Sequence, residues 1–315
     1  MSVIKRVVKK VLVIVIRPFI LYKLFQDSKI LPLVEGHRNT YIQLHTSYWL
    51  AFFKFPDLIK CEDFNQKIQW LKLFDNHQSM IKCVDKVLVR DYVSEVLGDG
   101  YLPELYQVSN SFSELDLSQL PESFVLKTNH DSGTVFLVLD KAEANYIAVE
   151  AKVKEALSEK FGSYGGEWPY LQLAPKVFAE EYLEPSSAKP PADYKFHCVN
   201  GKVKWLQYIY DRGSDTKEVI VNAKGEVLDI HFDENMVSMR EFEVPNEFGG
   251  MVLIAEKLSK PFKYVRVDLY LVDGEIVVGE LTFFPMYGCY GGKGQSALGE
   301  YLDFDRSEFK KPICG

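Results

Sequence analysis

The sequence contains few cysteines and no CxxC pair. Its five cysteines are scattered over 315 residues. A disulfide scaffold or a structural zinc site needs an even or closely spaced set of cysteines, so this distribution argues against both. We therefore expect a reducing, cytoplasmic environment.

Long hydrophobic runs, internal repeats and low-complexity tracts are also missing. In the N-terminal segment, the longest uninterrupted apolar run, residues 11–16, ends at Arg17 and Pro18, whereas a membrane-spanning helix needs about 20 apolar residues. No small-residue cleavage site follows this run, so the pattern does not indicate a signal peptide. With 47% hydrophobic and 14% aromatic residues, the chain can bury a large core, and its length suits two packed lobes with extensions.

Acidic residues are absent from the N-terminus, where residues 1–26 hold six basic residues and the first acid is Asp27. Of the 37 Lys and Arg residues, 31 lie beyond this segment, against 44 Asp and Glu residues, which leaves the rest of the chain at −13. An acidic body argues against nucleic acid as a partner.

The basic N-terminal segment has a helical pattern. Valines recur at four-residue spacing, at Val3, Val7, Val11 and Val15. Lysines occur elsewhere around the helix, at Lys5, Lys9 and Lys10. This pattern predicts a basic amphipathic helix over residues 1–26. Such a helix either lies on the anionic inner face of a membrane or packs on the protein's own body.

Hydrophobic periodicity predicts helices and strands in a mixed order. Helices are expected over 64–75, 85–98, 143–160 and 250–260. Strands or hairpins are expected over 123–140, 176–185, 193–213, 219–232 and 265–285, with turns at Asn200-Gly201 and Asp273-Gly274. The order predicts an α+β protein of four segments: an N-terminal extension (1–40), a mainly helical region (41–117), a small lobe (118–184) and a larger, mostly antiparallel lobe (185–315).

The hairpin over residues 123–140 contains a polar turn with the sequence KTNHDSG, residues 127–133. Its backbone N–H groups could bind phosphate oxygens, with Lys127 adding a positive charge. The turn is not a P-loop, because it does not match GxxxxGK[ST]. An ordinary polar hairpin loop explains the same residues.

The last hairpin carries charged residues where a half-buried sheet usually has Val or Thr. Strand periodicity places Arg266 and Asp268 on one face, and Glu280 and Thr282 on one face of the partner strand. Neighbouring carboxylates repel unless a cation lies between them, and Mg²⁺ prefers such ligands together with nucleotide phosphates. Arg266 could then hold a transferring phosphoryl group. A salt-bridge ladder along the hairpin, for example Arg266 with Glu280, is the alternative.

The stretch AEEYLEP, residues 179–185, joins a strand to a linker between the two lobes. Its backbone groups could face an adenine, and its carboxylates could face the amino group or the ribose. A solvated, charged strand edge is the alternative.

In their order and spacing, these stretches resemble the ATP-grasp superfamily, and more closely the TupA-like ATP-grasp family of bacterial polysaccharide gene clusters. The resemblance covers about residues 60–300. It is carried by FNQKIQWLKLFD (64–75), DKVLVRDYV (85–93), FVLKTNHDSG (124–133), EWPY (167–170), AEEYL (179–183), DYKFHCVNGKVKWLQ (193–207), FKYVRVDLY (262–270) and GELTFFP (279–285).

The resemblance implies an ATP-grasp fold, in which two α+β lobes with antiparallel sheets clamp ATP. It also implies an ATP- and Mg²⁺-dependent ligase that activates a carboxylate as an acyl phosphate, which an amine attacks to give an amide. The expected substrates are an amino acid or other amine and a uronic acid of a capsule or O-antigen glycan or sugar nucleotide. A glycosyltransferase, a kinase-like phosphotransferase and a non-catalytic scaffold that binds a nucleotide or glycan are the alternatives.

The resemblance also implies roles for individual residues. The phosphates of ATP would be bound by Lys86 and Lys127 and covered by a loop with Asn129, His130, Ser132 and Gly133. The adenine pocket would be lined by Glu180, Glu181, Tyr182 and Leu183, with Asp193 and Lys195 near the ribose or phosphates.

For the metal and the chemistry, the resemblance implies that Asp268 and Glu280 hold Mg²⁺. Thr282 stands where the superfamily often has asparagine, which makes one metal ligand weaker or replaces it with water. Arg266 would stabilise the acyl phosphate, and Arg212 would bind a substrate carboxylate.

Overall fold

The computed structural model describes residues 3–27, 38–183, 186, 190–212, 215–238, 242–292, 294–303 and 305. The chain divides into two compact units, and each is described by itself. The helical unit takes residues 1–77, 162–168 and 284–315, and the sheet unit takes residues 78–161 and 169–283.

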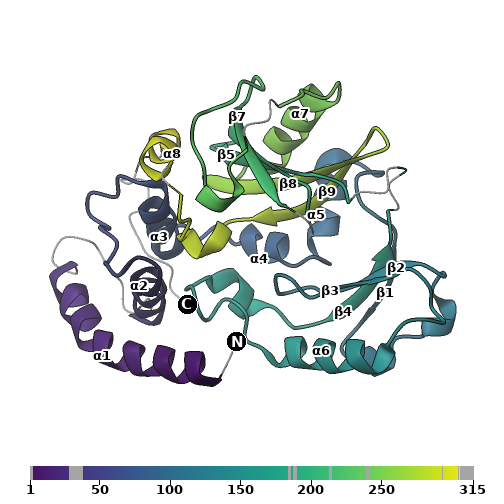
Figure 1. Cartoon of the computed structure of the whole chain (residues 1–315), viewed down its shortest axis with the longest axis horizontal. Coiled ribbons are helices and arrows are strands. Elements are labelled where there is room, and N and C mark those ends of the chain that lie inside the picture. Colours follow the sequence, from purple (N-terminus) through teal and green to yellow (C-terminus); the bar gives the residue numbers. More distant parts are fainter. Residues whose placement is uncertain are drawn as a thin grey trace. The chain divides into compact units, whose positions relative to one another are not determined.

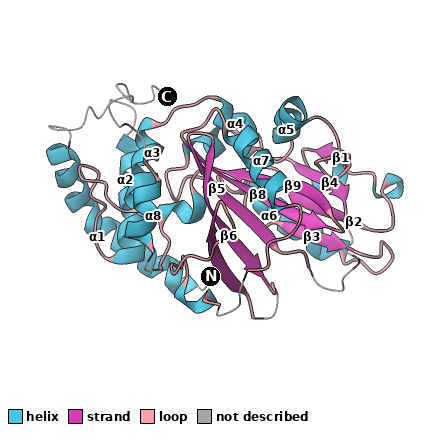
Figure 2. Cartoon of the chain, turned by 90° about the horizontal axis from the view of Figure 1, so that it is seen from above, coloured by secondary structure: helices cyan, strands magenta, loops and turns pink. Residues whose placement is uncertain are grey.

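The helical unit is built from α1 (Val3–Asp27), α2 (Arg38–Phe52), α3 (Phe64–Phe74), the short helix η5 (Pro285–Gly288) and α8 (Gln295–Tyr301). The helix predicted over 64–75 is confirmed as α3. The residue before it, Asp63, is its N-cap, and the Asp63 carboxylate accepts from the Gln66 N–H. Figures 1 and 2 both show α1 lying beside α2. In the part of the chain that the structure describes, no helix is long and apolar enough to cross a membrane.

A fully buried lysine lies at the centre of the helical unit. Lys72 Nζ donates to Gln69 Oε1 at 2.9 Å, to the Gly165 carbonyl at 2.8 Å and to the Tyr287 carbonyl at 2.7 Å. Tyr287 and its neighbour Met286 both have left-handed backbone angles, with φ values of 55° and 50°. Because such angles are strained for residues other than glycine, these hydrogen bonds hold the chain in an unusual turn directly after Thr282 and two phenylalanines.

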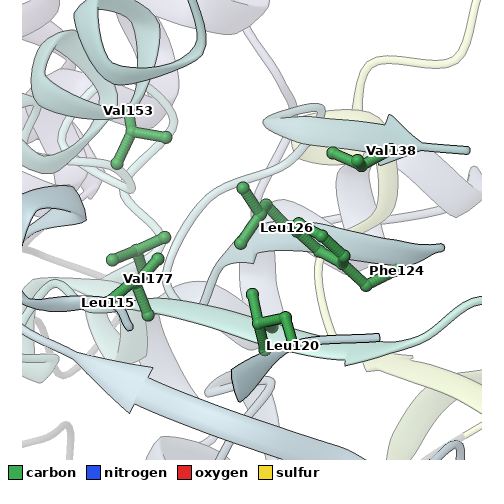
Figure 3. Packing of buried hydrophobic residues seen from close by; sticks show 8 residues of the cluster. Leu115, Leu120, Phe124, Leu126, Val138, Val153 and Val177 are labelled. Carbon is green, nitrogen blue, oxygen red and sulfur yellow. The ribbon is translucent and has the colours of Figure 1, made fainter. Parts of the chain in front are cut away.

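The sheet unit contains two antiparallel sheets. The first has the strand order β1-β4-β2-β3 and consists of β1 (Leu105–Ser109), β2 (Phe124–Thr128), β3 (Val135–Val138) and β4 (Val177–Glu181). One face packs on α6 (Tyr146–Ser158) through the hydrophobic core of Figure 3, which includes Phe124, Leu126 and Val153. Burying each of these side chains contributes about 1.5–3 kcal/mol. The opposite face carries Lys127 and Glu180, because side chains alternate along the strands.

The second sheet has the strand order β7-β6-β5-β8-β9. Its strands are β5 (Asp193–Val199), β6 (Lys202–Tyr210), β7 (Lys217–Asn222), β8 (Tyr264–Val272) and β9 (Glu275–Thr282). The predicted turns are confirmed: Asn200-Gly201 and Asp273-Gly274 both have the positive φ angles of type I′ hairpin turns. The α7 helix (Phe248–Ser259) packs against β5, β6 and β8, so one face of this sheet is apolar. The expected α+β class with antiparallel sheets is confirmed.

The remaining elements complete the sheet unit and correct two predictions. They are α4 (Ser79–Val84), α5 (Val89–Leu97), η1 (Phe112–Glu114), η2 (Leu117–Gln119), η3 (Trp168–Gln172) and η4 (Glu234–Met236). The helix predicted over 85–98 begins only at Val89, so Lys86 lies in a turn and not on a helix. The hairpin predicted over 219–232 is also wrong in its second half, where the structure has only an isolated bridge from Val221 to Val227.

Candidate functional site

A pocket of about 200 Å³ lies in the sheet unit, between residues of both sheets. Its walls are partly apolar, with Val125 and Phe178 from the first sheet and Val278 from the second. The predicted residues that line it are Lys86, Lys127, Glu180, Glu181, Tyr182 and Leu183. Apolar walls with a few charged groups are typical of sites that bind a flat organic ring carrying an anionic substituent.

Three charged side chains meet at one side of this pocket. Lys127 Nζ and Arg90 Nη1 each donate to a different oxygen of Glu180, and the Arg90 bond measures 3.2 Å. The register explains the meeting, because Glu180 pairs with Val125 and therefore shares a face of the sheet with Lys127. Sequence reasoning missed Arg90. The available signal was a basic residue within the helix predicted over 85–98, close in sequence to Lys86.

The turn that carries Lys86 is fixed by a buried aspartate. Asp85 Oδ1 accepts hydrogen bonds from the Val87 and Leu88 N–H groups at 2.8 and 3.1 Å, and its Oδ2 accepts from Asn129 Nδ2 at 2.7 Å. The backbone N–H of Lys86 donates to the Asn129 carbonyl at 3.0 Å. Lys86 Nζ donates to the carbonyl of Asp131. Asp85 was also missed, although an aspartate that can accept from the backbone N–H two residues further on is a common turn signal.

The predicted phosphate loop divides into anchoring and exposed residues. The Asn129 side chain is fully buried and also donates to the Ala174 carbonyl at 3.1 Å, and His130 Nε2 lies 3.2 Å from the Ala156 carbonyl. These two side chains therefore hold the loop from inside. Ser132 and Gly133 are exposed, and their backbone is the part of the loop that is open to a ligand. The carboxylate of Asp131 accepts from the hydroxyls of Thr128 and Thr134, so the loop's own residues bind it.

One face of the second sheet carries a row of polar side chains, most of them buried. Register pairs place Lys195 between Gln207 on β6 and Asp268 on β8, and Asp268 opposite Glu280 on β9. Gln207 in turn donates to Glu218 on β7 at 2.7 Å. The charged residues of the last hairpin are therefore part of a polar face that crosses all five strands, opposite the apolar face that packs on α7.

Arg266 joins the two carboxylates of the last hairpin. Its Nε donates to Asp268 Oδ1 at 2.6 Å, and its Nη2 donates to Asp268 Oδ2 at 2.7 Å and to Glu280 Oε1 at 3.3 Å. Lys195 Nζ also donates to Asp268 Oδ2, at 2.6 Å. Burial raises the pKa of Glu280, but the charges of Lys86, Arg266 and Lys195 outweigh it and hold the pKa at about 2. Glu280 is therefore ionised at any physiological pH, and Lys86 is close enough to influence it.

A third carboxylate, Asp193, extends this ion-pair cluster towards the pocket. It accepts from Arg212, from Lys195 Nζ at 3.1 Å and from the Tyr270 hydroxyl at 3.4 Å. Burial and the charges of Asp193 and Asp268 raise the pKa of Tyr270 far above its usual value, so its phenol stays neutral. Tyr270 also lines the pocket. Sequence reasoning missed it, because an aromatic residue in a strand usually belongs to the core.

The oxygen ligands available for a divalent cation are Asp268, Glu280 and Thr282. Within the described ranges, no three His, Cys, Asp or Glu side chains form a metal cluster, so any metal would rely partly on ligands from a substrate. The Glu280 side chain is 38% exposed, whereas that of Asp268 is buried and both its oxygens accept from cations. Each carboxylate offers about four lone-pair sites, so Asp268 keeps some acceptor capacity. Carboxylate and hydroxyl oxygens are the ligands Mg²⁺ prefers, and the set fits Mg²⁺ with Glu280 as the accessible ligand.

Comparison with known proteins places this site in a family. A sequence profile of the TupA-like ATPgrasp family matches residues 66–302, which include every predicted site residue. No curated protein matches the chain.

Solved structures show weaker similarity. A D-alanine–D-alanine ligase from Bacillus anthracis complexed with ATP is 21% identical, with a TM-score of 0.42, over 65% of this chain and 56% of the ligase. The corresponding ligase from Helicobacter pylori is 14% identical, with a TM-score of 0.39, over 71% and 63%. The ATP-grasp ligase PsnB, complexed with minimal precursor, Mg and ADP, is 13% identical, with a TM-score of 0.36, over 75% and 64%. The chain thus spans less than two thirds of the length of each.

Proposed function

We propose that this chain, which belongs to the TupA-like ATP-grasp family, is an ATP- and Mg²⁺-dependent ligase that joins a carboxylate to an amine. The observation that carries the proposal is the pairing of a partly apolar pocket with a cluster of cations. Lys86 and Lys127 line the pocket, and Lys195 and Arg266 flank the carboxylates Asp268 and Glu280. A nucleotide with a base, a phosphate chain and a metal ion matches this distribution of apolar, cationic and anionic groups.

The chain's own residues first bind and orient the nucleotide. The apolar walls formed by Val125, Phe178 and Leu183 hold the base, and Lys86 and Lys127 hold the phosphates. The exposed backbone of Ser132 and Gly133 closes over the phosphates and excludes water, which would otherwise hydrolyse an activated intermediate. When bound to Glu280 and Asp268, Mg²⁺ neutralises charge on the phosphate oxygens.

The chemistry then runs in two steps. A substrate carboxylate oxygen attacks the γ-phosphorus of ATP, the bond to the β-phosphate oxygen breaks, and ADP leaves. The amine attacks the carbonyl carbon of the resulting acyl phosphate, inorganic phosphate leaves with the bonding electrons, and the amine loses a proton. Arg266 and Lys195 hold the charge that develops on the phosphoryl oxygens. Arg212, whose side chain is 49% exposed, binds the incoming carboxylate.

We assign the carboxylate to a uronic acid of a bacterial surface polysaccharide, present as a glycan or a sugar nucleotide, and the amine to an amino acid. The support is the family to which the sequence belongs and the cationic surroundings, which suit anionic substrates. The reaction belongs in the cytoplasm, where ATP is available. The four cysteines that the structure describes form no disulfide, which agrees with this location.

A product analysis tests the proposal. The purified chain is incubated with ATP, Mg²⁺, a uronic acid and a mixture of amino acids, with hydroxylamine added in parallel to trap an acyl phosphate as a hydroxamate. We expect ADP and phosphate to form only with the acid present, a hydroxamate in the trapping reaction, and an amide with the amine. Glu280→Gln should lower the rate about 100-fold or more, whereas Lys154→Met, on the exposed side of α6, should leave it unchanged.

Other products would contradict the ligase. Release of a nucleoside diphosphate from a sugar nucleotide would indicate a glycosyltransferase, and a stable phosphorylated sugar would indicate a phosphotransferase. Binding of a non-hydrolysable ATP analogue without turnover of any substrate in the panel would indicate a scaffold.

A further inference from the structure

The α1 helix has two different apolar sides, and only one of them is covered. Ile16 and Ile20 are buried, and Asp27 at the end of the helix accepts a 2.6 Å hydrogen bond from Tyr41 on α2. On the other side, Ile14, Val15, Phe19, Tyr22 and Phe25 are 57% to 71% exposed. The sequence suggested that the helix either packs on the protein or lies on a membrane. The structure shows one side packed and leaves the opposite side open.

These exposed residues form one continuous strip. At 100° per residue, Ile14, Val15, Phe19, Tyr22 and Phe25 fall within an arc of about 140°. Three of the five are aromatic, and exposed aromatic residues are a small minority of the surface of most soluble domains. A strip of this size, on a helix outside the residues matched by the family profile, needs a partner.

The charges beside the strip identify the kind of partner. Arg17 is exposed on one flank, and Lys23 lies on the other. Residues 1–26 contain six basic residues and no acid, and the first acid, Asp27, is turned inward onto Tyr41 and Lys23. The described, exposed surface of α1 is therefore largely apolar, with Arg17 as a cation, Gln26 as a neutral polar residue and no acid. An anionic lipid surface complements both properties, because aromatic side chains enter the interface while lysine and arginine reach the headgroups.

A second copy of the chain complements the strip less well. Two α1 helices packed face to face would bring their basic flanks together, and like charges repel at such distances. The rest of the chain has a net charge of −13, so an anionic bilayer repels the body and attracts only the α1 side. We propose that the exposed face of α1 docks the protein on an anionic membrane surface, with α1 parallel to the bilayer and the acidic body pointing away from it.

Vesicle flotation of the full chain tests this proposal. We expect the protein to float with vesicles of phosphatidylcholine and phosphatidylglycerol but not with phosphatidylcholine alone, and raising the salt to about 0.5 M should release it. The double variant Ile14→Gln/Phe19→Gln should bind the mixed vesicles about tenfold less tightly or worse. Since both side chains are exposed, its melting temperature should match that of the unchanged protein.

A matched control uses Ile147, which is 85% exposed on α6 and carries no basic cluster. Ile147→Gln should float like the unchanged protein. Failure of the unchanged protein to float, equal flotation with both lipid mixtures, or equal flotation of the double variant would each overturn the proposal. A dimer in sedimentation velocity that the double variant abolishes, without vesicle binding, would assign the strip to self-association instead. Ligase activity is measured without vesicles and does not report on membrane binding. The membrane proposal and the proposed function can therefore fail independently.

Discussion

Lys127 lies at the end of β2 with its ammonium group on Glu180 and its side chain in the wall of the pocket. Replacing it with methionine removes the positive charge but keeps much of the apolar stem. Glu180 keeps its ion pair with Arg90, so no buried carboxylate is left without a cation. The substitution therefore tests the charge of Lys127 with little effect on the fold.

We predict that Lys127→Met lowers ATP turnover about 100-fold or more, because a fixed cation at the phosphates is lost. The measurement is the rate of ADP formation, with a melting curve to confirm folding. Lys154→Met serves again as the control, since it removes one exposed lysine from the same unit. A fully active Lys127→Met variant would show that the pocket lysine has no role with the nucleotide.

A second prediction at this scale concerns the buried pair of Lys72 and Glu167 in the helical unit. Burial raises the pKa of Glu167 from 4.5 to about 7, against the opposing charge of Lys72. The unfolded chain therefore releases this proton at a lower pH than the native protein does. The contribution of Glu167 to the free energy of unfolding is therefore largest below pH 4.5 and decreases as the pH rises to about 7.

Glu167→Gln should remove that decline. We expect the urea midpoint of the unchanged protein to fall between pH 4.5 and pH 7 relative to that of the variant, in the window set by the pKa of Glu167. For Lys72, burial lowers the pKa to about 8 although the charge of Glu167 opposes it. Above pH 8 the unfolded chain binds the extra proton, so stability from Lys72 rises with pH. If the urea midpoints of the unchanged protein and of Glu167→Gln change with pH in the same way, the assignment of the decline to Glu167 is contradicted.

At the scale of elements, the hairpins were predictable and the irregular segments were not. Asn200-Gly201 and Asp273-Gly274 are local signals that fix a turn whatever surrounds it. The short edge strand β1 has no alternating burial and contains a bulge, so its sequence carries no period of two. The chain after β7 runs across the sheet because Glu218 on the polar face accepts the N–H groups of Phe232 and Asp233. A contact of this kind cannot be read from residues 219–232.

Gly279 shows how closely β8 and β9 approach beside the pocket. A Cβ atom at this position would lie 2.7 Å from Cε2 of Tyr270 and 3.2 Å from the carbonyl oxygen of Asp268. The β8–β9 ladder shifts register between Asp268 and Leu269, which pair with Glu280 and Val278, so Gly279 is the extra, unpaired residue of β9. Any movement of Tyr270 therefore changes the pocket wall and the hydrogen bond to Asp193.

We predict that Gly279→Ala costs about 1–3 kcal/mol of stability through overpacking and weakens binding of an ATP analogue about tenfold. Calorimetric titration measures the affinity, and thermal unfolding measures the stability. The matched control is Gly249→Ala in α7, where a Cβ atom meets nothing within 4 Å. Unchanged affinity in Gly279→Ala would mean that Tyr270 does not shape the nucleotide site.

At the scale of the whole molecule, the sequence predicted the class and the family, but long-range assembly lay beyond it. The helical unit gathers residues 1–77, 162–168 and 284–315. Its centre depends on Gln69 and Lys72 bonding to Tyr287, more than two hundred positions away. Periodicity describes neighbours in the chain and carries no information on such contacts. The placement of the charged residues of the last hairpin on one face could be predicted from the sequence, because it depends only on the alternation of side chains along a strand.

Ligand-induced stabilisation is a prediction for the whole chain. A ligand at about 100 times its dissociation constant stabilises the native state by about 2.7 kcal/mol, which raises the melting temperature of a protein of this size by about 2–4 °C. We expect this rise with a non-hydrolysable ATP analogue and Mg²⁺. Glu280→Gln should lose the part of the rise that depends on Mg²⁺ and keep the part due to the nucleotide. A rise with a uridine sugar nucleotide and none with the ATP analogue would favour a transferase.

The ion pairs of the site have a consequence for ligand selectivity. Glu180 on Lys127, and Asp268 on Lys195 and Arg266, are tethered competitors that occupy the cations at a high effective concentration. Chloride or another monovalent anion in solution cannot match that effective concentration and therefore does not displace the carboxylates from these cations. Only a ligand that delivers several negative oxygens at once can displace these carboxylates together, so the ion pairs of the site favour binding of polyanions.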